Sequence, residues 1–184
     1  MLRLHFINVG DGDAILVEEL REGSAFRMLV DTGREDVGGE PGSLRRTAAE
    51  YLAELGITVL DALVVTHLHE DHFGGTAALA EKFSIGTVYS GFFPCLPVAS
   101  IVRTGAEEKT VRGLMDCLEQ WASCTEKLTA YGCRLCQVEE TAVLSLTPRL
   151  EAELICGDRS AAARQRQVWT ELLAGRMAGP DRVW

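Results

Sequence analysis

The chain has 184 residues, of which 47% are hydrophobic and 24% are charged. This composition is that of a globular protein with enough chain for one core, and no apolar run approaches the ~20 residues that a helix needs to cross a bilayer. The net charge of −9 argues against a broad basic face for nucleic acid, although bound divalent cations would add local positive charge. The N-terminus is too short and polar for a signal peptide, which predicts a cytoplasmic protein.

Six cysteines are present, and nothing in the sequence signals secretion, so their even number does not predict disulfides. Cys117 and Cys124 fall at helical spacing and are predicted to be small core residues. Cys133 and Cys136 form a Cys-x-x-Cys pair that would supply half of a zinc site. No second pair has matching spacing, and two reduced thiols at the start of a strand are the favoured interpretation.

The predicted elements alternate between strands and helices after a hairpin-rich start. Apolar periodicity and turn residues predict, in chain order, strands over 2–9 and 14–18 joined as a hairpin, a strand over 26–30, a helix over 44–55 capped by Ser43, a strand over 60–65, a helix over 76–83 and a strand over 87–89. An irregular segment over 91–107, a helix over 108–131, strands over 134–138, 142–146 and 151–156, and a helix over 161–173 follow. This order predicts an α/β layered fold with helices packed on a sheet.

The most informative segment directly follows the apolar strand 60–65 and reads Thr-His-Leu-His-Glu-Asp-His-Phe-Gly-Gly over 66–75. Three of the four histidines of the chain fall within six positions of this segment. Imidazole nitrogen and carboxylate oxygen are ligands that zinc prefers, usually about four of them at about 2.0–2.2 Å. A polar loop whose histidines only form hydrogen bonds is the alternative. The density of ligand-type side chains in a histidine-poor chain favours a metal site.

The spacing of these side chains suits two metal ions. His67 and His69 lie two residues apart, so at the end of a strand they project to the same side and can share one ion. Asp71 and His72 follow where the chain turns, and can face a second ion. Two metals about 3.5–4 Å apart can hold a bridging water, lower its pKa and stabilise an oxygen-rich transition state. The N-terminus of the helix over 76–83 is predicted to point partial positive charge toward the site, which suits an anionic substrate.

These motifs resemble those of a known family. Residues 67–72, preceded by Leu-Val-Asp-Thr-Gly over 29–33, resemble the signature of the metallo-β-lactamase fold superfamily. The opening Ile-Asn-Val-Gly-Asp-Gly-Asp-Ala over 7–14 is similar to the start of its ComEC-type, competence-related branch. Within this opening, turn capping by Asp11 and Asp13 is favoured over a position in the cleft. The resemblance covers the first half of the chain and implies a four-layer αβ/βα sandwich with metals at the sheet edge.

The resemblance also implies roles for individual residues. His67 and His69 would bind the first metal, and Asp71 and His72 would bind the second. Asp71 would also orient the attacking water, which makes it the candidate catalytic residue. Asp31 would lie behind the ligands and hold the motif loop by hydrogen bonds. A plain aspartate in a turn at the end of a strand is the alternative for Asp31.

The second half of the chain departs from the family pattern, which completes its site with later histidines and a bridging aspartate. No histidine follows His72, and His5 is predicted to be an ordinary strand residue. Asp158, which follows the last predicted strand in a Gly-Asp pair, is the candidate bridging ligand, with a turn between the last strand and the last helix as the alternative. Because the family domain is usually longer, the sandwich is predicted to be incomplete at its C-terminus.

The first functional hypothesis is a hydrolase that uses two divalent metal ions, with Zn²⁺ favoured and Mn²⁺ or Fe²⁺ accepting the same ligands. The ComEC-type opening suggests phosphodiester cleavage, and the alternative substrates are small-molecule esters, thioesters, lactams or lactones. Nucleic acid as a substrate is left open but is not supported by the charge. The second hypothesis is a truncated, non-catalytic domain that binds metal weakly or serves as an interaction module.

The whole chain, 1–184, is predicted to form one domain of this kind. Residues 91–131 are predicted to be a loop and helix inserted over the substrate. This insertion has no basic cluster that would identify the substrate. Its nearest candidates for one are Arg103, Lys109 and Arg112, for which a solvated surface beside acidic neighbours is the favoured interpretation.

Overall fold

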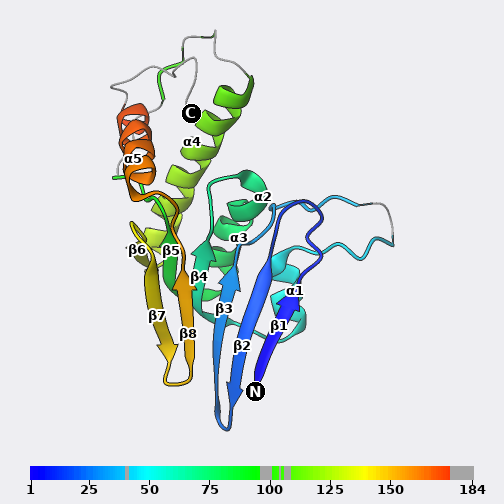
Figure 1. Cartoon of the computed structure of the whole chain (residues 1–184). Helices are drawn as coiled ribbons and strands as arrows, with labels where there is room; N and C mark the ends of the chain where they lie inside the picture. Colours follow the sequence, from blue (N-terminus) through cyan, green and yellow to red (C-terminus); the bar gives the residue numbers. More distant parts are fainter. Residues whose placement is uncertain (40–41, 96–100, 104, 106–108, 175–184) are drawn as a thin grey trace.

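The structure, a computed structural model, describes residues 1–39, 42–95, 101–103, 105 and 109–174. Six strands form one sheet in the order β1-β2-β3-β4-β5-β6, and two further strands form the hairpin β7-β8 (Figure 1). The strands are β1 (Leu2–Phe6), β2 (Ile15–Arg21), β3 (Ser24–Val30), β4 (Val59–Val65), β5 (Ser84–Ser90), β6 (Arg134–Gln137), β7 (Ala142–Thr147) and β8 (Leu150–Leu154). The helices are α1 (Ala48–Glu54), α2 (Glu70–Phe73), α3 (Thr76–Lys82), α4 (Lys109–Ala130) and α5 (Arg159–Leu173).

The direction of the strands decides where the site lies. The first three strands are successively antiparallel, as the predicted opening hairpin requires. β3, β4, β5 and β6 run parallel to one another. Parallel strands end at the same edge of a sheet, so the segments that follow β3, β4 and β5 meet at one edge. In Figure 1 this edge carries α2 and lies below α5.

Both faces of the central strands are covered. On one face, α1, α3 and α4 bury Leu29, Leu63 and Val88 in the main core. On the other face, Met28 and Val64 belong to a second cluster, against which the β7-β8 hairpin places Leu146, Ala152 and Leu154. Burial on both faces explains why the sequence of β4 is almost continuously apolar. The result is a mixed α/β fold with helices, a six-stranded sheet and a hairpin in layers, as the sequence predicts for a metallo-β-lactamase-like sandwich.

The first helix begins later than its sequence predicts. α1 starts after Thr47, whose hydroxyl accepts a hydrogen bond from the backbone N–H of Glu50, while the Glu50 carboxylate accepts one from the Thr47 N–H. This reciprocal capping box satisfies two backbone donors at once. Ser43 instead accepts a hydrogen bond from the Arg45 N–H in the preceding loop, and Leu44 is exposed. The prediction of a Ser43 cap is therefore wrong.

The long helix α4 forms part of the core. Met115, Leu118, Trp121 and Leu128 are fully buried in the same cluster as the sheet. That residues 91–131 form an insertion over the substrate stays a prediction. Half of the loop before it, residues 96–100, 104 and 106–108, lies outside the described residues. None of the helices in the described ranges is long and apolar enough to cross a membrane.

The cysteines are free thiols. Cys124 lies buried on α4, as its spacing predicts, and burial raises the pKa of its thiol to about 12. Across the residues that the structure describes, no cysteine joins a group of three ligand-type side chains. The Cys133-x-x-Cys136 pair is therefore seen as reduced thiols at the start of β6, with Cys133 buried.

Candidate metal centre

The histidine-rich loop lies at the end of β4 and brings its ligand-type side chains together in close pairs. His67 Nε2 lies 3.1 Å from His69 Nδ1. The rings of His67 and His72 have centroids 3.9 Å apart, and His72 Nε2 lies 3.8 Å from a carboxylate oxygen of Asp71. The pairing arises because the short helix α2 begins directly after His69 and turns Asp71 and His72 back toward the end of the strand.

Helix α2 is absent from the elements that the sequence pattern predicts. Its local signal was the acidic pair Glu70-Asp71, which lies in the first turn, where the helix dipole favours negative charge. Four residues are too few for apolar periodicity to reveal a helix.

Asp31 lies behind this loop and is almost completely buried, with 1% of its surface exposed. Its Oδ1 accepts a hydrogen bond from the Thr66 backbone N–H at 2.8 Å. Its Oδ2 accepts one from the Thr66 hydroxyl at 2.6 Å and one from His72 Nδ1 at 2.8 Å. Because a carboxylate only accepts, Nδ1 of His72 carries the proton and Nε2 keeps its lone pair for a metal. Asp31 thereby fixes the orientation of a predicted ligand.

The end of β3 is also hydrogen-bonded to the backbone of the same loop. The Thr32 N–H and hydroxyl both donate to the carbonyl of His72, at 2.7 and 3.1 Å. Asp31 reaches this position with a φ of 55°, a left-handed conformation that aspartate tolerates better than most residues. The end of β3 and the loop after β4 are therefore held together by main-chain and side-chain bonds.

The opening turn between β1 and β2 also packs against the motif loop. A Cβ atom on Gly12 would lie 1.8 Å from the backbone oxygen of Asp71, so only glycine fits there. A carboxylate oxygen of Asp13 lies 4.0 Å from His72 Nδ1. The family-like opening segment thus forms one wall of the candidate centre.

His72, one of the predicted ligands, also belongs to a second group of ligand-type side chains. Atoms of Asp13, Asp31 and His72 lie within 4.8 Å of one another. This group uses Nδ1 of His72, whereas the close approach to Asp71 uses Nε2. Since both oxygens of Asp31 already accept hydrogen bonds from protein donors, we interpret this group as a support for His72. Within the described ranges, no group of three such residues includes His69 or Asp158.

The charge state of His67 suits a metal ligand. Burial lowers the pKa of His67, and the neighbouring His72 and His69 lower it further. A lowered pKa keeps the imidazole neutral at neutral pH, which is the form that binds a metal.

Asp158 caps α5. Its Oδ1 accepts hydrogen bonds from the backbone N–H groups of Ser160 and Ala161 at 2.7 and 3.1 Å. A hydrogen bond from the Ser160 hydroxyl, together with these two backbone bonds, lowers the pKa of Asp158. The adjacent Gly157 lines the same cavity as His67, so the loop that carries Asp158 borders the centre.

Two other positions are occupied by purely structural contacts. His5 donates or accepts through Nδ1 with the Tyr51 hydroxyl, and its Nε2 lies 3.0 Å from the buried Glu18 carboxylate. The N-terminus of α3 is buried, because Thr76 is fully covered and the Gly75 N–H donates to the carbonyl of Gly33. The predicted use of this helix terminus to attract an anionic substrate is therefore wrong.

A sequence profile of the metallo-beta-lactamase superfamily matches residues 7–103, more than half of the chain and all of the centre described above except Asp158. The chain belongs to the metallo-beta-lactamase superfamily. Members of this superfamily typically bind divalent metals and are mostly hydrolases.

The chain is also similar to two known proteins. It is 29% identical over 140 residues to the anti-Pycsar protein Apyc1 of Paenibacillus xerothermodurans, a match that covers 72% of this chain and 46% of that protein. The chain thus spans about half the length of this curated relative. A structural match is the archaeal metallo-beta-lactamase superfamily protein ST1585 from Sulfolobus tokodaii, with 19% identity, a TM-score of 0.42 and coverage of 83% of this chain and 54% of that one.

The donor set of this superfamily member fits a divalent metal. Two nitrogens that each lie 2.0–2.1 Å from a tetrahedral zinc ion are about 3.3–3.4 Å apart. The separation of 3.1 Å between His67 Nε2 and His69 Nδ1 is close to that value. Neutral imidazoles and carboxylates also satisfy Mn²⁺ and Fe²⁺.

We expect Gly12→Ala to destabilise the fold more than Gly23→Ala. Both glycines have a positive φ, 84° and 74°, so both changes carry a backbone cost of about 1–2 kcal/mol. Only Gly12 approaches the Asp71 backbone, whereas nothing lies within 4 Å of a Cβ on Gly23. Urea denaturation of the two variants measures the difference, which we expect to exceed about 1 kcal/mol. Equal losses of stability would mean that the opening turn does not support the motif loop.

Proposed function

We propose that this chain is a metal-dependent hydrolase that activates water at a pair of divalent ions, with Zn²⁺ as the favoured metal. In this proposal His67 and His69 bind the first ion, and Asp71 and His72 bind the second. The observation that carries the proposal is the hydrogen bond between Asp31 and Nδ1 of His72, which leaves Nε2 of His72 free beside Asp71. The same carboxylate accepts a hydrogen bond from Thr66, whose hydroxyl also contacts His67.

Bound divalent ions would supply Lewis acidity and lower the pKa of a water molecule held between them. The residues of the chain then have distinct tasks. Asp71, which is partly exposed, orients the attacking water and accepts its proton. Asp31 holds the His72 ring in one orientation and one tautomer, because its buried carboxylate accepts the Nδ1 proton. Thr66 ties the base of the loop to the same carboxylate.

We further propose that the chain belongs to the ComEC-type branch and that the bond cleaved is a phosphodiester. The Ile-Asn-Val-Gly-Asp-Gly-Asp-Ala opening supports this assignment, and its glycine packs directly on the loop that carries the ligands. A cavity of about 380 Å³ reaches His67 and supports a small substrate. The net charge of −9 weighs against long nucleic acid, and Arg103 is already paired with Asp116 and Glu119.

Hydrolysis of a small-molecule ester, thioester, lactam or lactone is the alternative, because the same metal chemistry polarises a carbonyl. A non-catalytic metal-binding domain is the other alternative. It is favoured by the lack of histidines after His72 among these 184 residues.

The metal content of the purified protein tests the centre. Elemental analysis of protein prepared without chelator is expected to find near two ions per chain, and about one or fewer in the double variant His67→Ala/His69→Ala, because both ligands of the first ion are lost while Asp71 and His72 remain. His5→Gln is the matched control, since it removes a histidine whose partners are Glu18 and Tyr51. Near-zero metal in the unaltered chain would favour the non-catalytic alternative.

Asp158→Asn separates metal bridging from helix capping. Asparagine caps helices about as well as aspartate, so α5 stays capped while the charge that would bridge two ions is removed. If Asp158 completes the centre through its Oδ2, since Oδ1 is used in the cap, we expect fewer ions per chain and unchanged thermal unfolding of the metal-free protein. An unchanged metal content would restrict Asp158 to its role as a cap.

A pair of chromogenic substrates tests the reaction. We expect bis(4-nitrophenyl) phosphate to be cleaved in preference to 4-nitrophenyl butyrate, with loss of cleavage after chelation and restoration by Zn²⁺ or Mn²⁺. Asp71→Asn is expected to lower kcat by about 10²–10⁴-fold, because the proton acceptor is lost. Preferential cleavage of the carboxylic ester would replace the phosphodiester assignment with the alternative hydrolase.

A further inference from the structure

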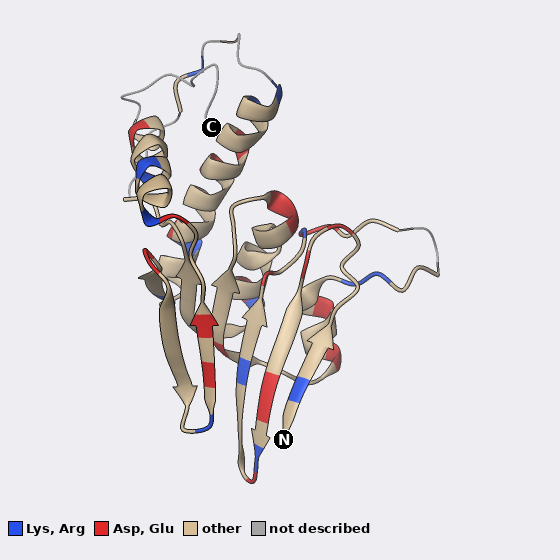
Figure 2. Ribbon diagram, viewed as in Figure 1, with Lys and Arg blue, Asp and Glu red and all other residues tan. Residues whose placement is uncertain are grey.

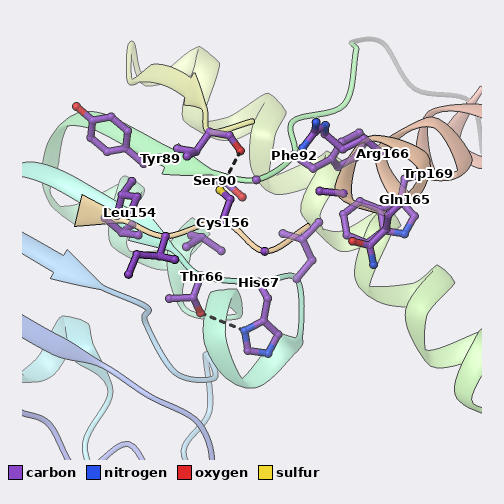
Figure 3. A pocket seen from close by; sticks show the side chains of 18 of the residues that line it. Thr66, His67, Tyr89, Ser90, Phe92, Leu154, Cys156, Gln165, Arg166 and Trp169 are labelled. Atoms are coloured by element: carbon purple, nitrogen blue, oxygen red, sulfur yellow. Dashed lines mark hydrogen bonds between the residues drawn. The ribbon is translucent and has the colours of Figure 1, made fainter. Parts of the chain in front are cut away.

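Thr66 lies between the buried carboxylate of Asp31 and the ring of His67. Its hydroxyl is 2.6 Å from Asp31 Oδ2 and 3.1 Å from His67 Nδ1. Figure 3 shows the second of these contacts at the edge of the cavity that reaches His67. The backbone N–H of Thr66 donates to the other oxygen of Asp31 at 2.8 Å, so Thr66 is bound to this carboxylate twice. The two bonds hold the hydroxyl between an acceptor and an imidazole nitrogen.

The single proton of this hydroxyl can be donated to only one of the two neighbours. A carboxylate only accepts, so two oxygens 2.6 Å apart with no proton between them would repel each other. The hydroxyl therefore donates to Asp31 and accepts from His67. This requires the proton of the neutral His67 ring to lie on Nδ1, which leaves the lone pair of Nε2 free. Nε2 is the atom that faces His69 Nδ1 at 3.1 Å.

The same carboxylate oxygen orients a second ring. Asp31 Oδ2 also accepts from Nδ1 of His72 at 2.8 Å, and Nε2 of His72 lies on the side of Asp71. His69 differs, because among the described residues its hydrogen-bond partner is His67 alone. Two of the three histidines of the motif are thus oriented by one carboxylate, and in the proposed function these two bind different ions.

We propose that Asp31 and Thr66 act together as positioning residues for both metal ions. Asp31 sets the tautomer of His72 directly and sets that of His67 through the Thr66 hydroxyl. Both rings then present Nε2 to a cation without first moving a proton between their own nitrogens, so the two metal positions depend on one buried group. The inference rests on the proposed function only in naming His67 and His72 as ligands, because the tautomers are properties of the chain itself.

The tautomers can be measured directly. Two-bond ¹H–¹⁵N spectra of the imidazole rings show which nitrogen carries the proton in a full chain labelled at its four histidines. At about pH 9, where an ordinary imidazole is neutral, we expect His67 and His72 to carry it on Nδ1, both with Zn²⁺ and after chelation. His5 is the internal reference for the opposite tautomer, because its Nε2 lies 3.0 Å from the Glu18 carboxylate. A proton on Nε2 of His67 in the unaltered chain would overturn the inference.

Two substitutions at Thr66 separate its hydroxyl from its shape. Thr66→Val keeps the branched side chain but leaves Nδ1 of His67 without an acceptor, so the proton can move to Nε2. We expect one of the two Zn²⁺ ions to bind about tenfold more weakly in a titration against a chromogenic chelator. The tautomer of His72 should stay unchanged, because its bond to Asp31 remains. Thr66→Ser should restore both the His67 tautomer and the affinity, and equal losses in the two variants would overturn the role of the hydroxyl.

Asp31→Asn is expected to reverse both tautomers at once. The Thr66 backbone N–H can only donate, so it keeps the amide oxygen of asparagine on its side. The amide NH₂ then faces the Thr66 hydroxyl and His72 Nδ1. Both rings would carry the proton on Nε2, and both ions should bind about 10–100-fold more weakly. Asparagine tolerates the positive φ of 55° at this position, so the backbone can stay in place.

Glu70→Gln is the matched control for the loss of a negative charge. Figure 2 shows that α2 is acidic, and the Glu70 carboxylate on this helix pairs with Arg34. This change should leave the tautomers as they are. Unchanged tautomers in Asp31→Asn, or affinities lowered as much by Glu70→Gln, would overturn the inference. The expected tautomers and affinities in a chain that cleaves nothing would support it and remove only the catalytic proposal.

Discussion

The arrangement of the candidate centre depends on one buried carboxylate. Burying an isolated charge is costly, so the carboxylate of Asp31 persists at 1% exposure only because protein donors surround it. Those donors come from Thr66 and His72, which lie 35 and 41 residues away along the chain. Satisfying Asp31 therefore requires the end of β3, the end of β4 and α2 to meet at one point. The cost of burial makes this packing specific, because any other arrangement of these segments would leave the Asp31 carboxylate without hydrogen-bond donors.

Much of this arrangement could be predicted from short-range pattern. The apolar run of β4 and the histidine spacing after it are local signals, and they identified both the strand and the loop that carries the ligand-type residues. The alternation in β1 and β2 likewise predicted their hairpin. Element boundaries were less predictable where two local solutions compete, as at α1. Ser43 and Thr47 are both plausible caps in sequence, and Thr47 forms the cap because Glu50 returns a second hydrogen bond.

What sequence pattern could not show is contact between distant segments. Nothing local to Gly12 reveals that its missing side chain makes room for the backbone of Asp71, almost 60 positions later. The amphipathic pattern of α4 predicts a helix but does not say what its apolar face packs against. The structure shows this through the burial of Trp121 in the main core. For the same reason the cavity between His67 and Trp169 was not foreseen, because its walls come from β4, β5, β8 and α5.

The parallel strands explain why the centre and the cavity adjoin. β3 ends at Asp31, β4 at the histidine loop and β5 at Ser90, all at one edge of the sheet. Charge is unevenly distributed along that edge. Asp13, Asp31, Glu70 and Asp71 concentrate negative charge around His72, where only Arg34 pairs with one of them in the described chain. A divalent cation would offset this excess, whereas an anion would be repelled from it. The anionic ester of the proposed function would therefore reach the histidines only once cations have reversed the local charge. Metal binding and substrate binding are in this way expected to be coupled through the same few charges.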